Sequence, residues 1–76
     1  MKKQTAKSSV SLLEVVALLK GLPDHKLGRG QVGTVVERLD GRTLLVEFSD
    51  DEGRAYALAP CPQDELLVLH YLPEAA

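Results

Sequence analysis

The chain has 76 residues, the size of one small domain, and 45% of them are hydrophobic. Its formal net charge is −2, and three of its nine basic residues fall among the first nine positions, so six basic residues face eleven acidic ones from residue 10 onward. An acidic body repels phosphate backbones and no stretch reaches the roughly 18 apolar residues of a membrane span, which argues against extensive nucleic-acid contact and against a membrane anchor.

The N-terminal residues 1–9 are polar, cationic and without periodicity, so we expect a disordered tail followed by a single domain over residues 10–73. The only cysteine, Cys61, has no partner for an internal disulfide. No small-residue cleavage site of a signal peptide follows the first apolar run. These features predict a protein of the reducing cytoplasm.

Residues 11–20 fit two structures. Ser11 followed by Glu14 is a capping box, and the apolar residues after it have helical spacing, which favours a short helix. The same apolar residues also alternate as in a strand, and the adjacent β-branched pair Val15 and Val16 disfavours a helix. Periodicity alone leaves the choice between strand and helix open.

A loop is predicted for residues 21–30, because Pro23 interrupts strand pairing and the Gly, Asp and Pro content is typical of turns. His25 in this loop has no visible acid–base partner, so we interpret it as a surface histidine. Gly30 and Gly33 predict a bend or a close backbone approach where the next strand begins.

A hairpin is the clearest local prediction. Two apolar runs, Val32 to Leu39 and Thr43 to Phe48, flank Asp40-Gly41, which favours a two-residue type I′ turn in which Leu39 pairs with Arg42. The first strand has no cleanly polar face, so the alternation does not decide which of its residues face the core. In the second strand one face is fully apolar and is assigned to the core: Leu44, Val46 and Phe48.

The C-terminal half is predicted to contain a hairpin tip and two more strands. The acidic run Asp50 to Glu52 lacks the ligand spacing of a calcium loop and is predicted to be a solvated hairpin tip. A strand with an alanine face follows from Arg54 to Ala59, and Pro60-Cys-Pro62 is expected to end it. A helical turn over residues 63–65 then precedes a buried strand of seven residues, Leu66 to Leu72, in which His70 is expected to be structural.

Five short strands and one short helical turn predict a mainly β fold, arranged as a small five-stranded SH3-like barrel. Leu13-Glu-Val-Val-Ala-Leu18, Leu27-Gly-Arg-Gly-Gln-Val-Gly-Thr-Val-Val-Glu37 and Val46-Glu-Phe48 resemble a family of small bacterial proteins with the domain of unknown function four-nine-two-six. This resemblance, over roughly residues 12–70, implies an SH3-like barrel whose first segment is a strand, and implies no established activity. A weaker similarity to the KOW element, which often contacts RNA, is carried by Gly30, Gly33 and Val35, whereas the basic residues of KOW domains are largely missing.

No catalytic constellation is visible, because the potential nucleophiles Cys61 and Ser49 and the two histidines are scattered among elements. We therefore expect no enzyme, no cofactor and no metal site. The leading hypothesis is a non-enzymatic protein-interaction module, of an accessory, immunity or antitoxin-like kind, that binds a protein partner through loops held on a rigid scaffold. Its expected contact residues are Arg29, Asp50, Asp51, Glu52, Arg54 and Tyr56.

Two alternatives accompany this hypothesis. The first is KOW-like RNA or DNA binding, which the acidic body disfavours. The second is a homodimer, because residues 10–19 and 66–72 offer more apolar surface than one small sheet buries on a single side. The basic residues available for nucleic acid are Lys2, Lys3, Lys7, Arg29, Arg38 and Arg42.

Overall fold

The computed structural model describes residues 10–73, so the predicted tail over residues 1–9 lies outside the described part of the chain. Five antiparallel strands form one sheet in the order β4-β3-β2-β1-β5, which confirms the mainly β class and the number of strands. The strands are β1 (Val15–Leu18), β2 (Val32–Arg38), β3 (Thr43–Ser49), β4 (Ala55–Pro62) and β5 (Leu66–Val68). Two short 3-10 helices, η1 (Pro23–His25) and η2 (Gln63–Glu65), lie in the connections.

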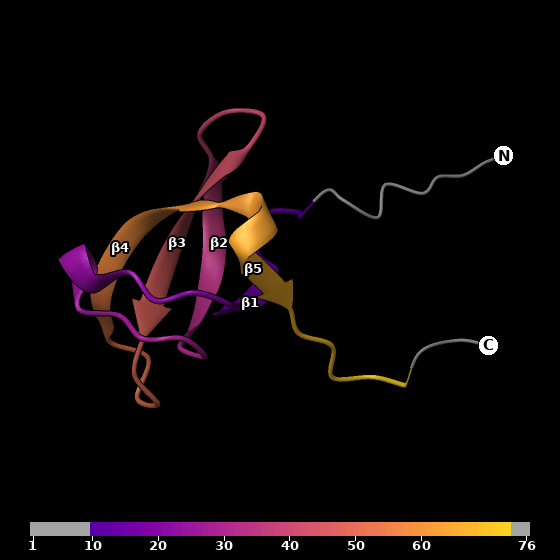
Figure 1. Ribbon diagram of the computed structural model, residues 1–76. Helices are drawn as coiled ribbons and strands as arrows, with labels where there is room; N and C mark the ends of the chain where they lie inside the picture. The colour runs from indigo at the N-terminus through magenta and orange to yellow at the C-terminus, as the bar shows by residue number, and fades with distance from the viewer. Residues whose placement is uncertain (1–9, 74–76) are drawn as a thin grey trace, which may run out of the picture.

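The sheet is strongly curled but open. Figure 1 shows η2 carrying the chain from the end of β4 across to β5. Within residues 10–73, β4 and β5 are the two edges of the sheet and no strand pairing joins them. Because β5 is only three residues long, it offers little strand to lie along β4. Closure of an SH3-like barrel by backbone pairing is therefore not confirmed.

The core lies on the inner face of this curled sheet. Phe48 is fully buried there together with Leu44 and Val46, which confirms the predicted core face of β3. The inward residues of β2, which the sequence left open, are Gly33 and Val35. A Cβ at Gly33 would lie 2.6 Å from Val46 Cγ1, so only glycine permits the observed approach of β2 to β3.

Residues 11–20 contain a strand and no helix. The capping-box residues do interact, since the Ser11 N–H donates to Glu14 Oε1 (2.8 Å) and the Glu14 N–H donates to the Ser11 carbonyl (3.3 Å). However, Leu13 has a left-handed φ of 68°, which a right-handed helix does not accommodate. The contacts therefore close a turn, after which β1 begins at Val15.

The connection between β2 and β3 corrects the predicted type I′ turn. Neither Asp40 nor Gly41 has the positive φ that such a turn requires. The Leu39 N–H donates to the Thr43 carbonyl (2.9 Å), so Leu39 does not pair with Arg42. Asp40 Oδ1 instead accepts a hydrogen bond from the Arg42 N–H (2.8 Å), and this Asx turn stabilises a wider loop.

Strand β4 continues through Pro60 and Pro62, so the prediction that Pro60-Cys-Pro62 ends this strand is wrong. The Gln63 N–H donates to the Arg42 carbonyl (2.7 Å), and donors alternate in direction along a strand. Both proline nitrogens therefore point away from β3, toward the outer edge of the sheet, where a missing N–H breaks no ladder bond.

The last strand is shorter than predicted. It ends at Val68, and the residues after it are largely exposed, including His70, Tyr71 (77%) and Leu72 (81%). The reason lies in β1, because Leu69 still donates to the Val15 carbonyl but the chain before Val15 turns away at Leu13. The prediction of a seven-residue buried strand containing a structural His70 is wrong.

Candidate functional site

The β3–β4 turn carries most of the predicted contact residues, and its shape depends on Asp50. The Asp50 N–H donates to the Arg54 carbonyl (2.9 Å), and Asp50 Oδ1 accepts from the backbone N–H groups of Glu52 and Arg54 (2.9 Å each). Gly53 provides the left-handed residue with a φ of 83°. One oxygen of Asp50 is thus used to form the turn.

The charges of this turn are partly paired. The Arg54 guanidinium forms an exposed ion pair with Glu52, and its Nε lies 4.0 Å from Asp50 Oδ2. Three carboxylates against one guanidinium leave the turn negative, and Asp51 makes no ion pair with any residue that the structure describes. The turn therefore offers an acidic, solvent-facing tip, as predicted.

Tyr56 lies next to this turn and connects it to a distant loop. Its hydroxyl accepts a hydrogen bond from Gln31 Nε2 (2.9 Å), while Gln31 Oε1 accepts from the Gly28 N–H. The backbone of the same loop is held to the end of β1, because Leu18 donates to the Gln31 carbonyl (2.9 Å) and Gly30 donates to the Leu18 carbonyl (2.7 Å). Sequence reasoning missed Gln31, since no local pattern marks a contact across 25 residues.

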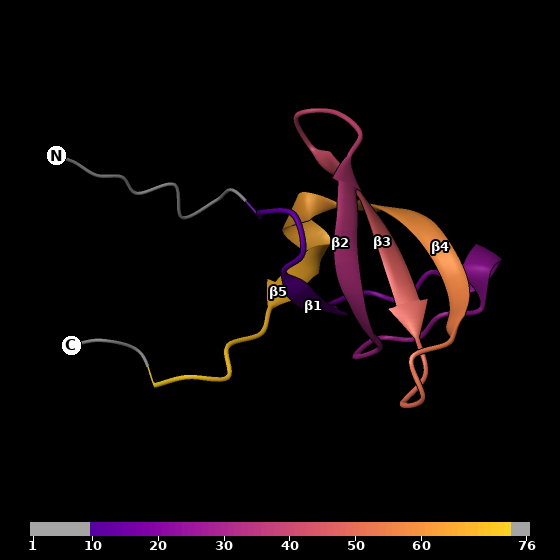
Figure 2. The same ribbon diagram turned by 180° about the vertical axis from the view of Figure 1, so that it is seen from behind.

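These contacts bring together a surface that we call the β4 face. It consists of Gln31, Tyr56, Leu58 and the turn Asp50–Arg54. Tyr56 is 51% exposed and Leu58 54% exposed on the outer side of β4. Figures 1 and 2 agree that the connection containing η1 and the β3–β4 turn lie at the same end of the sheet, beside β4. Arg29 belongs to the connection that contains η1. All six predicted contact residues therefore lie at this end of the sheet.

The predicted basic residues are not assembled into one strip. Arg38 is used internally, because its Nη2 donates to the Val10 carbonyl (2.9 Å) and to Gln63 Oε1 (2.8 Å), and its Nη1 donates to the Asp40 carbonyl (3.2 Å). Arg29 precedes β2 and Arg42 follows it, so these two lie at opposite ends of that strand. The three lysines of residues 1–9 are outside the described range.

The domain matches one known family. A family model described as Domain of unknown function (DUF4926) matches residues 12–68, which is 57 of the 76 residues. The chain belongs to this family. No curated protein and no solved structure matches the chain. The DUF4926 match contains all five strands and the whole β4 face, and it ends where β5 ends.

The candidate nucleophiles of this DUF4926 domain are separated. Cys61 is fully buried on β4, and burial, together with the nearby Glu65 carboxylate, raises the pKa of its thiol to about 11. A protonated, inaccessible thiol is a poor nucleophile at neutral pH. Ser49 ends β3, whereas His25 lies in η1 and His70 follows β5. Among residues 10–73, no group of three His, Cys, Asp or Glu side chains is placed to hold a metal ion.

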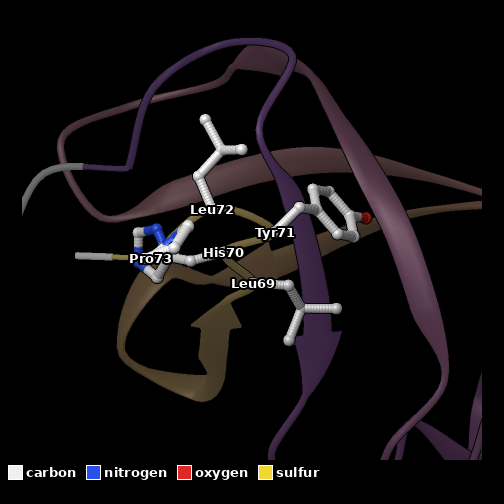
Figure 3. A pocket seen from close by; sticks show the side chains of 5 residues that line it. All are labelled: Leu69, His70, Tyr71, Leu72 and Pro73. Atoms are coloured by element: carbon white, nitrogen blue, oxygen red, sulfur yellow. The ribbon is translucent and has the colours of Figure 1, made fainter.

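Three hollows of the DUF4926 domain lie away from the β4 face. One, of about 450 Å³, is lined by the five consecutive residues 69–73, whose side chains point in different directions in Figure 3. A second, of about 310 Å³, is lined by Gly41, Arg42, Pro62, Gln63 and Asp64. The third, of about 470 Å³, borders β5 and is lined by Val10, Gln63, Asp64, Leu66, Leu67, Val68 and His70. The helices within residues 10–73, η1 and η2, have three residues each, so neither can span a membrane.

Proposed function

We propose that this DUF4926 domain is a non-enzymatic protein-binding module that holds a protein partner against the β4 face. The observation that carries the proposal is the hydrogen bond between Gln31 and Tyr56, because it fixes an aromatic side chain that remains half exposed. An aromatic side chain whose orientation is already fixed loses little conformational freedom on binding, which is why such residues serve as anchors of interfaces.

The chemistry of the β4 face indicates the kind of partner. Tyr56 and Leu58 offer an exposed apolar centre, and Glu47 lies opposite Leu58 in the β3–β4 register. The acidic turn Asp50–Arg54 flanks this centre at one end. A complementary protein surface has an apolar contact bordered by Lys or Arg side chains, whose charges attract the acidic turn and guide the approach. An accessory, immunity or antitoxin-like role in the cytoplasm stays a prediction.

A matched pair of variants tests the proposal. The tagged wild type captures its partner from lysate of the source organism, in parallel with and without nuclease, and is compared with Leu58→Asp and Leu39→Asp. Both leucines are about half exposed (54% and 45%), but Leu39 lies in the β2–β3 loop at the other end of the sheet. The proposal expects one protein with the wild type and with Leu39→Asp, and its loss with Leu58→Asp.

Other outcomes contradict the β4 face as the binding surface. Capture that survives Leu58→Asp, or that both variants abolish, places the contact elsewhere. Material that disappears with nuclease instead supports KOW-like RNA or DNA binding, the weaker alternative, for which the internal use of Arg38 leaves few free basic residues among those described.

A further inference from the structure

The outer edge of β5 carries unpaired backbone groups. Leu19 donates to the Glu65 carbonyl and Leu69 donates to the Val15 carbonyl (2.9 Å each), so residues 65, 67 and 69 direct their polar backbone groups at β1. By alternation, the Val68 N–H and C=O point away from β1. The same holds for the Leu66 carbonyl and the His70 N–H.

Nothing in the described chain covers this edge. The hollow of about 470 Å³ runs beside it and is bordered by Val10 and Gln63 as well as by β5 itself. Neither polar backbone group of Val68 has a hydrogen-bond partner within residues 10–73, whereas the Leu66 N–H is taken by the Gln63 carbonyl. An uncovered strand edge is a template on which a further strand can pair.

The segment that follows β5 is apolar and exposed. We call Leu69–Pro73 the C-terminal arm; Figures 1 and 2 show it leading away from the sheet. From Leu66 to Pro73 there is no Asp, Glu, Lys or Arg, in a domain that is otherwise rich in acids. Two copies of this chain can therefore approach each other here without the like-charge repulsion that the rest of the acidic surface imposes.

We propose that two copies of the chain pair antiparallel through their β5 edges, about a twofold axis at Val68. Each Val68 N–H donates to the Val68 carbonyl of the second copy, and each His70 N–H donates to the Leu66 carbonyl of that copy. The surface is self-complementary, as a twofold interface requires. The five-residue arm, at about 3.3 Å per extended residue, is long enough to cross the three-residue β5 of the second copy and cover its hollow.

The opposite edge of the sheet explains why pairing stops at two copies. On β4 the nitrogens of Pro60 and Pro62 face outward and have no hydrogen to donate. That edge therefore lacks two of its outward donors, which weakens any further ladder there and disfavours growth of the paired sheet into a fibre. The β5 edge carries no proline within the strand.

Proline substitutions at the two edges form a matched test. Val68→Pro removes the outward N–H of β5 and leaves the ladder to β1 intact, whereas Leu58→Pro removes an outward N–H from the β4 edge. Analytical ultracentrifugation across a wide range of concentration is expected to give twice the 8.3 kDa chain mass for the wild type and for Leu58→Pro. Val68→Pro is expected to stay at 8.3 kDa while keeping the far-UV circular dichroism of the wild type.

Amide hydrogen exchange of the wild type decides the question if Val68→Pro does not fold. The Val68 and His70 amides are expected to become protected as concentration rises, while the Leu58 amide is unchanged. A wild type of 8.3 kDa at every concentration overturns the proposal, and so does a dimer in which these two amides stay unprotected. Protection that arises only when a different protein is added also overturns it, and assigns the edge to that protein.

Discussion

Arg38 and Gln63 are joined by a hydrogen bond of 2.8 Å from Nη2 to Oε1, which connects the end of β2 to η2. The same Gln63 oxygen accepts from the Val10 N–H (3.2 Å), and Arg38 also donates to the Val10 carbonyl. These contacts hold η2 and the segment before β1 against the sheet at the place where β4 and β5 do not pair. They replace part of the backbone pairing that a closed barrel would have there.

Arg38→Ala is expected to destabilise the domain. Loss of these charge-assisted hydrogen bonds costs on the order of 1–2 kcal/mol, because the exposed guanidinium is partly screened by water. Urea unfolding measures the change. Arg42→Ala removes an equal charge from the neighbouring loop and is expected to change the free energy of unfolding by less than about 0.5 kcal/mol. Equal effects of the two variants contradict a structural role for Arg38.

Gly33→Ala is expected to lower the melting temperature. The new Cβ would meet Val46 Cγ1 at 2.6 Å and the Glu47 carbonyl at 2.8 Å, and overpacking of this kind costs about 1–3 kcal/mol. In a domain of this size each 1 kcal/mol corresponds to a shift of roughly 4–8 °C. Gly41→Ala is the control, since no atom lies within 4 Å of its Cβ position. A thermal scan that shows no difference between the two variants contradicts the close approach.

Cys61 is expected to make stability fall at alkaline pH. Its pKa is raised from 9.0 to about 11 by burial, with the Glu65 carboxylate adding to the shift. The folded state therefore holds the thiol proton more tightly than the unfolded state. The stabilisation that the protonated thiol gives to the folded state is complete below pH 9 and is lost between pH 9 and 11. Urea titrations of the wild type and of Cys61→Ala over this range measure it. The prediction is contradicted if the free energy of unfolding of the wild type changes with pH in the same way as that of Cys61→Ala.

Asp40 is expected to favour the fold more strongly when it is ionised than when it is protonated. The hydrogen bond from the Arg42 N–H lowers the pKa of this carboxyl below 3.8, so the contribution is present above pH 3.8 and is lost as the pH falls through the lowered value. Asp40→Asn keeps an acceptor for the Asx turn and removes this acid dependence, whereas Asp40→Ala loses both. Thermal scans between neutral and acidic pH compare the three proteins. An acid dependence that persists in Asp40→Asn belongs to another group.

The features that could be predicted are those that depend on neighbouring residues. Alternation placed Leu44 and Phe48 in the core, and the acids near Gly53 marked a turn, because side-chain direction and turn chemistry are local properties. The family resemblance favoured the strand at β1 where periodicity could not decide. The predicted contact residues of the β3–β4 turn lie together for the same local reason.

The features that were missed depend on contacts between distant residues. The length of β5 is set by where β1 begins, and β1 begins after the left-handed Leu13, which no residue preference marks. Gln31 can donate a hydrogen bond to the Tyr56 hydroxyl only because the fold places β4 beside the residue that precedes β2. The prolines of β4 are tolerated because that strand is an edge, and position within a sheet is decided by the whole fold.

The open arrangement of the sheet has a mechanical consequence. In a single copy, β5 is held to β1 by a ladder of three residue pairs and is the last strand within residues 10–73, so a force applied at Pro73 peels it from β1 one pair at a time. The longer β3 and β4, which share a ladder over most of their lengths, are not loaded until that peeling is complete. The domain is therefore mechanically weakest at its C-terminal edge, and it can release that strand while the rest of the sheet stays paired.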